Sequence, residues 1–487
     1  MSSVPQDVVD RLGALDLYDP KCEGYETDGS VETALSDPPD SGDERQLEDG
    51  EIADDNEKQA KNYKRSLRRT ERRKGDSNRK AEELRKAQRT TQETLAPILG
   101  VVADEIHIHM VRRDLRGLER LREREKGSGT RKPGSLTHDD VNELIKVDWM
   151  FEPGIHIGYL SEKGKEQPTI VFMVKIKPWD SLQVETRNEF QQTLQTVMDW
   201  SQCTYAIKNN AAMKSPADHA EESIVVVAPR GTMVGIGWHA SMEPGKTLVN
   251  YAPADKSEDG IDEYRRLNKR LPELAELYRQ EFAGLFPAGM NHMQAFSDAN
   301  AVASFGDILD GDAKQRPFAN SLTATLNEFC NFQHMDKDAA PVAFGMWWEA
   351  QKLHGEWTFT PDADHARTTG GGFLWGAYGA GVDFARARGL VEIYWRGQLD
   401  WHGTLVSKDQ DEFTRFGTSI QLTERGVRAM RSVWDVDQLA ASGHDIHQLA
   451  PKSAARITTA ADRIAKAGEQ RVGASVSNTM PIIDLPC

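Results

Sequence analysis

Short apolar or alternating runs recur between turn signals from Asn320 to Leu422, and no other feature constrains the fold of this chain as strongly. Successive side chains of an extended chain point to opposite faces, so runs of this length and alternation predict strands. No helical pattern separates them, and Gly370-Gly-Gly supplies a tight bend. The pattern predicts an all-β barrel or sandwich rather than βαβ units. The predicted strands are residues 321–329, 342–349, 372–378, 391–395, 402–406 and 414–422.

Helical patterns dominate outside this region. Apolar residues at helical spacing predict helices at 91–125, 141–150, 179–201, 262–282, 291–301, 423–434 and 453–468. Thr137 is placed to cap the second of these, and Pro272 to kink the fourth. Further strands are expected at 154–160 and 169–175, followed by a hairpin of 223–229 with 233–239. The expected class is α+β, a β-core supported by N-terminal and flanking helices.

Charge is segregated along the chain, although the total is acidic at −16. Residues 1–57 hold 18 acidic residues against three basic ones, and they have few large apolar groups. They cannot bury enough surface to offset the entropy of ordering. Residues 58–89 hold 14 basic residues against four acidic ones. This basic stretch suits nuclear import or contact with nucleic acid, or it is a solvated helix whose charge the acidic tail offsets.

These shifts in composition predict four parts. In chain order they are a disordered acidic tail (1–57), a basic and largely helical arm (58–135), a main domain (136–435, with its β-core at about 320–422) and a C-terminal tail with a peripheral helix (436–487).

The spacing of the cysteines and the hydropathy of the chain predict the kind of compartment in which the protein resides. The four cysteines are far apart and show no C-x-x-C spacing, which predicts a reducing compartment, no disulfides and no structural zinc. The N-terminus lacks a secretory apolar segment, and the longest apolar runs, such as 169–175, are too short to span a bilayer. We therefore expect an intracellular protein without membrane association.

Candidate metal ligands lie at the end of the first predicted β-core strand. His334 and Asp336 form an H-x-D pair, and residues two apart in an extended chain share a face. A second imidazole, His402, lies on a later predicted strand. Two histidines and one carboxylate are the facial triad that holds non-haem Fe(II) and leaves positions open for co-substrate and O2. Thirteen residues beyond His402 comes Arg415, whose guanidinium matches a carboxylate in bidentate fashion.

Each of these residues has rivals and an ordinary structural alternative. A second H-x-D, His138-Asp-Asp140, lies at a predicted helix start, where Asp is favoured by the helix dipole. The ordinary alternative is that His402 and Arg415 are surface residues, or core residues whose polar groups are hydrogen-bonded. The rival residues are His239, His354 and His365 for the third ligand, and Arg425 and Arg428 for the carboxylate.

Four motifs resemble one enzyme family. F-C-N-F-Q-H-M-D-K-D, G-G-G-F-L-W-G-A-Y-G-A-G-V-D-F, L-D-W-H-G-T-L-V-S and T-R-F-G-T-S-I-Q-L are similar to the Tet-like oxygenases of basidiomycete fungi, within the TET/JBP superfamily. The resemblance covers roughly residues 150–435. It implies a double-stranded β-helix (jelly-roll, cupin-like) core and a dioxygenase that uses Fe(II), 2-oxoglutarate and O2. Unlike animal TET enzymes, the chain has no cysteine-rich zinc-binding module.

The resemblance also assigns roles. His334, Asp336 and His402 would bind iron, and Arg415 would bind the distal carboxylate of 2-oxoglutarate. Ser419, which alternates onto the face of Arg415, or Thr404, beside the distal histidine, would donate a hydroxyl to that carboxylate.

The family oxidises the methyl group of modified pyrimidines, which implies 5-methylcytosine in DNA as the substrate. The base would be flipped out of the duplex, and Asp338 is a candidate to read its exocyclic amine unless it only forms a turn. A basic N-terminal zone, 58–89 with the basic residues of 112–126, would contact phosphates of methylated DNA in the nucleus. The alternatives are a 2-oxoglutarate-dependent hydroxylase of protein side chains, or a catalytically lapsed, mobile-element-derived protein that binds DNA or a partner.

Overall fold

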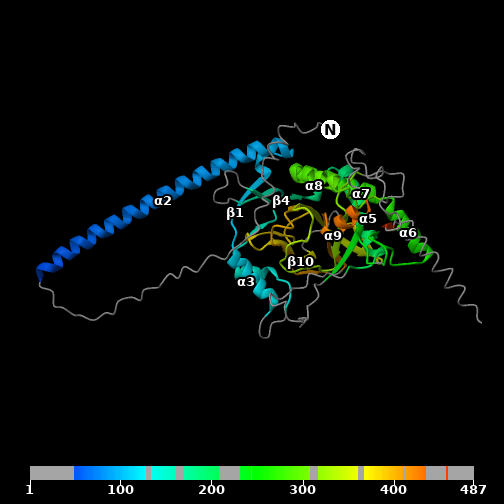
Figure 1. The fold of residues 1–487 in the computed structure, drawn as a ribbon. Coiled ribbons are helices and arrows are strands. Elements are labelled where there is room, and N and C mark those ends of the chain that lie inside the picture. The colour runs from blue at the N-terminus through cyan, green and yellow to red at the C-terminus, as the bar shows by residue number, and fades with distance from the viewer. Residues whose placement is uncertain are drawn as a thin grey trace, which may run out of the picture. The chain divides into compact units, whose positions relative to one another are not determined.

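The computed structural model describes residues 49–127, 133–160, 169–207, 231–242, 244–307, 316–359, 367–410, 412–434 and 457–458. The chain divides into two compact units, Tyr18–Asp104 and a larger unit that contains Glu105–Cys487. The smaller unit holds one long helix, α2 (Asp49–Leu99; Figure 1). No helix within the described ranges has the length and apolar character of a membrane span.

The larger unit is built on an eleven-stranded sheet with the order β1-β3-β4-β13-β8-β16-β7-β5-β6-β17, to which β9 adds at β8. Most neighbours pair antiparallel, whereas β1 pairs parallel with β3, and β17 with β6. The strands are β1 (Ile106–Val111), β3 (Gly154–Leu160), β4 (Thr169–Lys177), β5 (Thr232–Ala240), β6 (Leu248–Asn250), β7 (Ser321–Leu326), β8 (Ala343–Leu353), β9 (Glu356–Phe359), β13 (Leu390–Trp395), β16 (Phe413–Gln421) and β17 (Ile457–Thr458).

A smaller sheet faces part of this large one. Its order is β14-β11-β12-β2, with β14 (Gly403–Thr404), β11 (Gly372–Trp375), β12 (Ala380–Asp383) and β2 (Asp148–Met150). A two-stranded pair, β10 (Thr368–Gly370) with β15 (Ser407–Asp409), adjoins it. The fold is α+β with a jelly-roll core, as the sequence predicts.

Central strands of the large sheet are apolar on both faces because both faces are covered. On β13, Val391, Ile393 and Trp395 pack into one core cluster with Phe373 and Val382 of the small sheet. The alternate residue Tyr394 instead contacts helix α7 through Phe282. The interior between the two sheets is therefore a closed, largely aromatic space, and residues on its walls are shielded from water.

Helices cover the outer face of the large sheet. α7 packs on β13 and β4, and α9 packs on β5 and β6 (Figure 1). The buried Tyr278 hydroxyl of α7 donates to Thr418 Oγ1 of β16 at 2.6 Å. The helices of the larger unit are α3 (Leu115–Lys126), α4 (His138–Leu144), α5 (Val184–Cys203), α6 (Glu258–Asn268), α7 (Leu271–Leu285), α8 (Pro287–Ala299) and α9 (Glu424–Val433), with a short 3-10 turn η2 (Trp179–Ser181). A second 3-10 turn, η1 (Ala103–Glu105), lies at the boundary between the two units.

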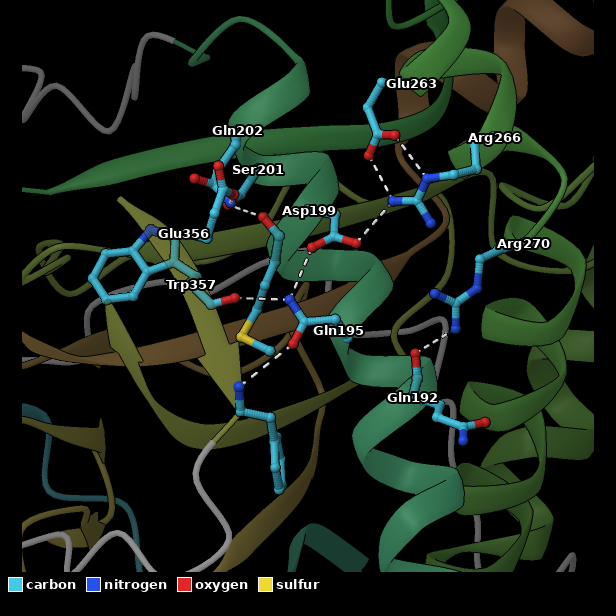
Figure 2. Close-up of polar contacts among 12 residues, drawn as sticks. Gln192, Gln195, Asp199, Ser201, Gln202, Glu263, Arg266, Arg270, Glu356 and Trp357 are labelled. Atoms are coloured by element: carbon cyan, nitrogen blue, oxygen red, sulfur yellow. Dashed lines mark hydrogen bonds and ion pairs between the residues drawn. The ribbon is translucent and has the colours of Figure 1, made fainter. Parts of the chain in front are cut away.

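Polar side chains tie α5 to its neighbours (Figure 2). Arg266 of α6 bridges Glu263 and, at 3.1 Å, Asp199 of α5. Gln195 Nε2 of α5 donates to the backbone carbonyl of Trp357 in β9 at 2.8 Å. These contacts join the helical layer to the β8–β9 hairpin, which extends the large sheet.

All six predicted β-core strands are confirmed, and so are those at 154–160 and 169–175. Thr137 caps α4 through a capping box with Asp140, as expected. Four helix predictions need correction. Residues 106–111 of the predicted helix 91–125 form strand β1, and residues 148–150 of the predicted helix 141–150 form strand β2. Residues 457–458 of the predicted helix 453–468 form strand β17, which pairs with β6. Pro272 begins α7 rather than kinking one long helix. The hairpin arm 223–229, residues 1–48 of the acidic tail and the C-terminal tail apart from 457–458 lie outside the described residues.

Candidate metal centre

Two strand-end segments meet in a narrow antiparallel ladder that carries the candidate ligands. His334 and His402 exchange backbone bonds, N–H to carbonyl, of 2.8 and 2.9 Å. Two residues further on, Asp336 N–H donates to the carbonyl of Gly397 at 2.8 Å. Because residues two apart share a face, this pairing places the two imidazoles and the carboxylate side by side.

The three side chains are arranged as a metal site. One ligand atom from each of His334, Asp336 and His402 lies within 4.8 Å of the others. The two Asp336 oxygens lie 3.4 Å from His334 Nε2 and 3.3 Å from His402 Nε2. Ligands at right angles, each about 2.1 Å from one ion, are separated by about 3 Å. The donor set and its spacing thus fit a two-histidine, one-carboxylate Fe(II) site.

Both imidazoles are oriented through their other ring nitrogen. Nδ1 of His334 lies 2.7 Å from the carbonyl of Phe332, and Nδ1 of His402 lies 2.9 Å from that of Asp400. A carbonyl only accepts, so each Nδ1 carries the proton and each Nε2 presents a lone pair. Metal-binding histidines are held in this way in proteins.

Electrostatics keep the carboxylate ionised. Burial alone would raise the pKa of Asp336; when the imidazoles also carry a proton on Nε2, as they can without a metal ion, the charges and hydrogen bonds of His402 and His334 outweigh burial and hold that pKa well below its usual range. An ionised carboxylate is the form that binds a metal.

Two further residues confine Asp336. Gln421 Nε2, at the end of β16, donates to Asp336 Oδ2 at 3.1 Å. Gly397 leaves the space that the carboxylate occupies, because a Cβ there would lie 2.5 Å from Asp336 Oδ2. The sequence gives no sign of either contact, since both arise where distant strand ends converge.

The turn before His402 is fixed by a buried ion pair. Arg396 donates to both oxygens of Asp400, at 2.7 and 2.8 Å, and the Tyr378 hydroxyl donates to the same carboxylate at 2.5 Å. The backbone carbonyl of Asp400 is the one that orients His402. The ring of His402 also stacks on Phe373 at a centroid distance of 5.5 Å.

Arg415 is buried inside the jelly roll, on β16 opposite Glu349 of β8. Its guanidinium lies 5.1 Å from the ring centre of Phe384. Burial lowers the pKa of Arg415 to about 10, against the opposing effect of nearby acids, so the group is cationic at neutral pH. Its Nε and Nη2 are buried and have no hydrogen-bond partner in the described part of the chain. Two unused donors on a buried cation suit a bound carboxylate.

A narrow cavity of about 20 Å³ reaches this guanidinium, and Thr404, Ser407 and Trp347 are among the residues that line it. That volume holds about one water molecule, so the lining must shift to admit a dicarboxylic acid. Ser419 does not line the cavity, because four residues along a strand place it about 13 Å from Arg415. The structure thus does not bring Ser419 beside Arg415, whereas Ser407 contributes a second hydroxyl to the lining. Ser407 could have been suspected only from its place after Thr404 in the quoted motif.

An open groove of about 790 Å³ begins beside the metal ligands, between the H-x-D loop, α8 and α9. Asp336, Asp338, Lys337 and Arg431 are among its lining residues. Asp338 is buried, and its Oδ2 has no hydrogen-bond partner among described residues. Burial and the neighbouring Asp336 raise the pKa of Asp338 well above its usual range. Asp338 is thus placed at the mouth of the site rather than in a solvated turn.

The basic residues of α3 are only partly available to a ligand. Arg124 pairs with Asp140 and Glu143, each at 3.0 Å, and Lys126 pairs with Glu123 at 2.6 Å. The exposed basic residues near the start of this segment are Arg112, Arg113 and Arg116.

The rival residues lie elsewhere. His354 is exposed in the tight turn between β8 and β9, and His239, on β5, contacts the ring of Tyr251 in a tilted arrangement. Arg425 and Arg428 are exposed on α9. His365 lies outside the described residues. The H-x-D pair at His138 begins α4, as the capping prediction requires.

Comparison with known proteins agrees with this chemistry. Residues 185–407 match the family model of the Tet-like 2OG-Fe(II) oxygenase superfamily, a span that contains the triad and ends before Arg415. No curated protein matches the sequence. A solved structure, NgTET1 in complex with 5mC DNA, aligns with 55% of this chain and 77% of that chain, at 11% identity and a TM-score of 0.29, a likeness too weak to support a structural inference. Residues 185–407 thus match the Tet-like 2OG-Fe(II) oxygenase superfamily, and the chain is a 2-oxoglutarate-dependent iron dioxygenase that uses Fe(II), 2-oxoglutarate and O2.

Proposed function

We propose that His334, Asp336 and His402 hold the iron and that Arg415, with hydroxyls of Thr404 and Ser407, binds the distal carboxylate of 2-oxoglutarate. The observation that carries this proposal is the convergence of the three ligand atoms within 4.8 Å, each imidazole oriented by a backbone carbonyl. The unused donors of Arg415 support the second half. The chemistry supplied by bound iron, 2-oxoglutarate and O2 is oxidative: 2-oxoglutarate becomes succinate and CO2 while a substrate C–H bond is hydroxylated.

The chain's own residues set the conditions for this chemistry. The aromatic walls between the two sheets exclude water from the interior that contains Arg415. The groove beside Asp336 leaves one side of the centre open to a substrate. The nearly closed cavity at Arg415 is lined by Thr404, two residues after His402, and the open groove is lined by Asp336.

The substrate that we propose is 5-methylcytosine in DNA, oxidised to 5-hydroxymethylcytosine and further products. The resemblance of four motifs to Tet-like enzymes supports it, and a nuclear location would follow from it. Asp338, which lines the groove and has an unpartnered oxygen, is the candidate to contact the exocyclic amine of a flipped base.

Phosphate contacts are proposed for the basic stretch 58–89 and for the exposed arginines Arg112 and Arg116. Arg124 and Lys126 are left out because their acidic partners already occupy them. Replacing Arg112 and Arg116 by alanine should reduce the slope of log affinity against log salt by about one to two units. An unchanged slope would remove these residues from the interface.

The decisive experiment incubates the protein with Fe(II), 2-oxoglutarate and duplex DNA containing 5-methylcytosine, and follows the bases by mass spectrometry. Oxidised cytosine with wild type, and none with Asp336→Ala, supports the proposal. Unchanged bases, together with succinate that forms only when a protein extract is added, would point to a side-chain hydroxylase. Iron-bound protein that forms no succinate under any condition would favour a lapsed enzyme.

A further inference from the structure

Helix α3 contacts the residue directly before each candidate iron-binding histidine, through the backbone of Gln333 and the side chain of Trp401. The helix belongs to the same compact unit as the metal centre and precedes the segment that matches the family model. Its sequence, L-R-G-L-E-R-L-R-E-R-E-K, is mostly charged, yet Leu118, Leu121 and Glu125 are buried on one face. A buried glutamate requires a partner, because a buried polar group without a hydrogen bond is costly even when uncharged.

Glu125 finds its partner at the first histidine segment. Its side chain is 1% exposed, and its two carboxylate oxygens accept from the backbone N–H of Gln333 at 3.0 and 3.2 Å. Gln333 is also held through its side chain, whose Oε1 accepts from Gly376 N–H at 3.0 Å. The next residue is His334, so the backbone that carries this ligand is fixed from two directions.

Arg122, one turn earlier on the same face, reaches the second histidine segment. Its guanidinium lies 4.1 Å above the ring of Trp401, within cation–π distance. The residue after Trp401 is His402. The helix is itself anchored at its N-terminus, because Asp114 caps it and donates from its backbone N–H to the carbonyl of Ala377 at 2.7 Å.

We propose that α3 is a positioning element of the metal centre, in which Glu125 and Arg122 set the placement of His334 and His402 through the residues that precede them. Neither residue touches the metal position or a substrate. Both act on ligands that must keep their places within a few tenths of an ångström for tight metal binding. The inference rests on the proposed function, since it takes the two histidines to be ligands.

The test uses Co(II) binding to the full-length apo protein, followed by visible absorption, with thermal unfolding of the apo form recorded beside it. Glu125→Ala and Arg122→Ala should each weaken Co(II) binding about 10- to 100-fold, as removal of outer-sphere support does. Glu125→Gln keeps one acceptor oxygen, and Arg122→Lys keeps a cation, so each should show a smaller loss than its alanine partner. The matched control is Glu123→Ala on the exposed side of α3, which should bind Co(II) like wild type.

The KM for 2-oxoglutarate, measured with Fe(II) in excess, gives a second readout. It should change little in Arg122→Ala, because Arg415 is untouched, whereas general damage to the fold would raise it. If Glu125→Ala does not fold, Glu125→Gln and Arg122→Ala decide the question.

Folded Arg122→Ala and Glu125→Gln proteins that bind Co(II) as tightly as wild type would overturn the positioning role. That failure is distinct from failure of the proposed function. The latter appears as Co(II) binding in Asp336→Ala that equals wild type.

Discussion

Gly397→Ala would test how closely this chain is fitted around the metal ligands. The added Cβ would lie 2.5 Å from Asp336 Oδ2, and real Cβ contacts below 3.0 Å are essentially never seen. The backbones cannot separate freely, because Asp336 N–H donates to the Gly397 carbonyl at 2.8 Å. The carboxylate itself must therefore withdraw by about 0.5 Å or more.

That displacement is large for a metal site and small for the fold. Metal–ligand distances are held to about 0.2 Å, so the ligand set would be distorted. We expect metal binding to weaken about 10- to 100-fold, which corresponds to about 1.4–2.7 kcal/mol. The apo protein should lose no more than about 1.5 kcal/mol, because a change in the Asp336 side-chain torsions can absorb the shift.

The assay is a Co(II) titration with thermal unfolding of the apo protein, and the matched control is Gly284→Ala. Gly284 lies in α7, and a Cβ there would have no atom within 4 Å. Alanine in a helix should stabilise by about 0.5–1 kcal/mol and leave metal binding unchanged. Wild-type Co(II) affinity in Gly397→Ala would refute the placement of Asp336 against this turn.

Three further changes have defined outcomes. Arg415→Met should raise the KM for 2-oxoglutarate more than about tenfold without changing Co(II) affinity, because hydrogen bonds to charged groups contribute about 1.5–3 kcal/mol; an unaltered KM would exclude Arg415 as the carboxylate partner. Gln421→Leu removes the donor to Asp336 Oδ2 and should weaken Co(II) binding about tenfold, which the same titration detects. Burial lowers the pKa of His156 to about 3. Between about pH 6.5 and pH 3 the unfolded chain therefore binds a proton at His156, whereas the folded protein does not. His156 should therefore cost stability as the pH falls from 6.5 toward 3, by up to about 1.4 kcal/mol per pH unit, and urea unfolding of His156→Leu should show a flatter pH dependence than wild type.

The β-core was predictable because its signal is local. Alternation and turn residues specify strands wherever a sheet has two covered or half-covered faces, and all six predicted runs became strands. The sequence 106–111 shows the limit of this reasoning. Ile106 and Met110 fit a helical spacing, but the segment also alternates, and parallel pairing with β3 decides in favour of a strand. Such pairing depends on residues some fifty positions away and leaves no local mark.

The part of the site that could be predicted is the pair of ligands that lie close together in the sequence. His334 and Asp336 are two residues apart, which suffices to place them on one face. What the sequence could not show is the support: Gly397, Gln421 and Glu125 each lie far along the chain from the residue that they contact. Ser419 was placed beside Arg415 by alternation alone, which fixes a face but not a position along the strand.

The most direct test of the central claim is the Fe(II) content of the protein under anaerobic conditions, compared between wild type and Asp336→Ala. One tightly bound Fe(II) per chain in wild type, lost in Asp336→Ala without loss of folding, is the predicted result. Equal iron binding by the two proteins, or none by either, would contradict a metal centre at His334, Asp336 and His402.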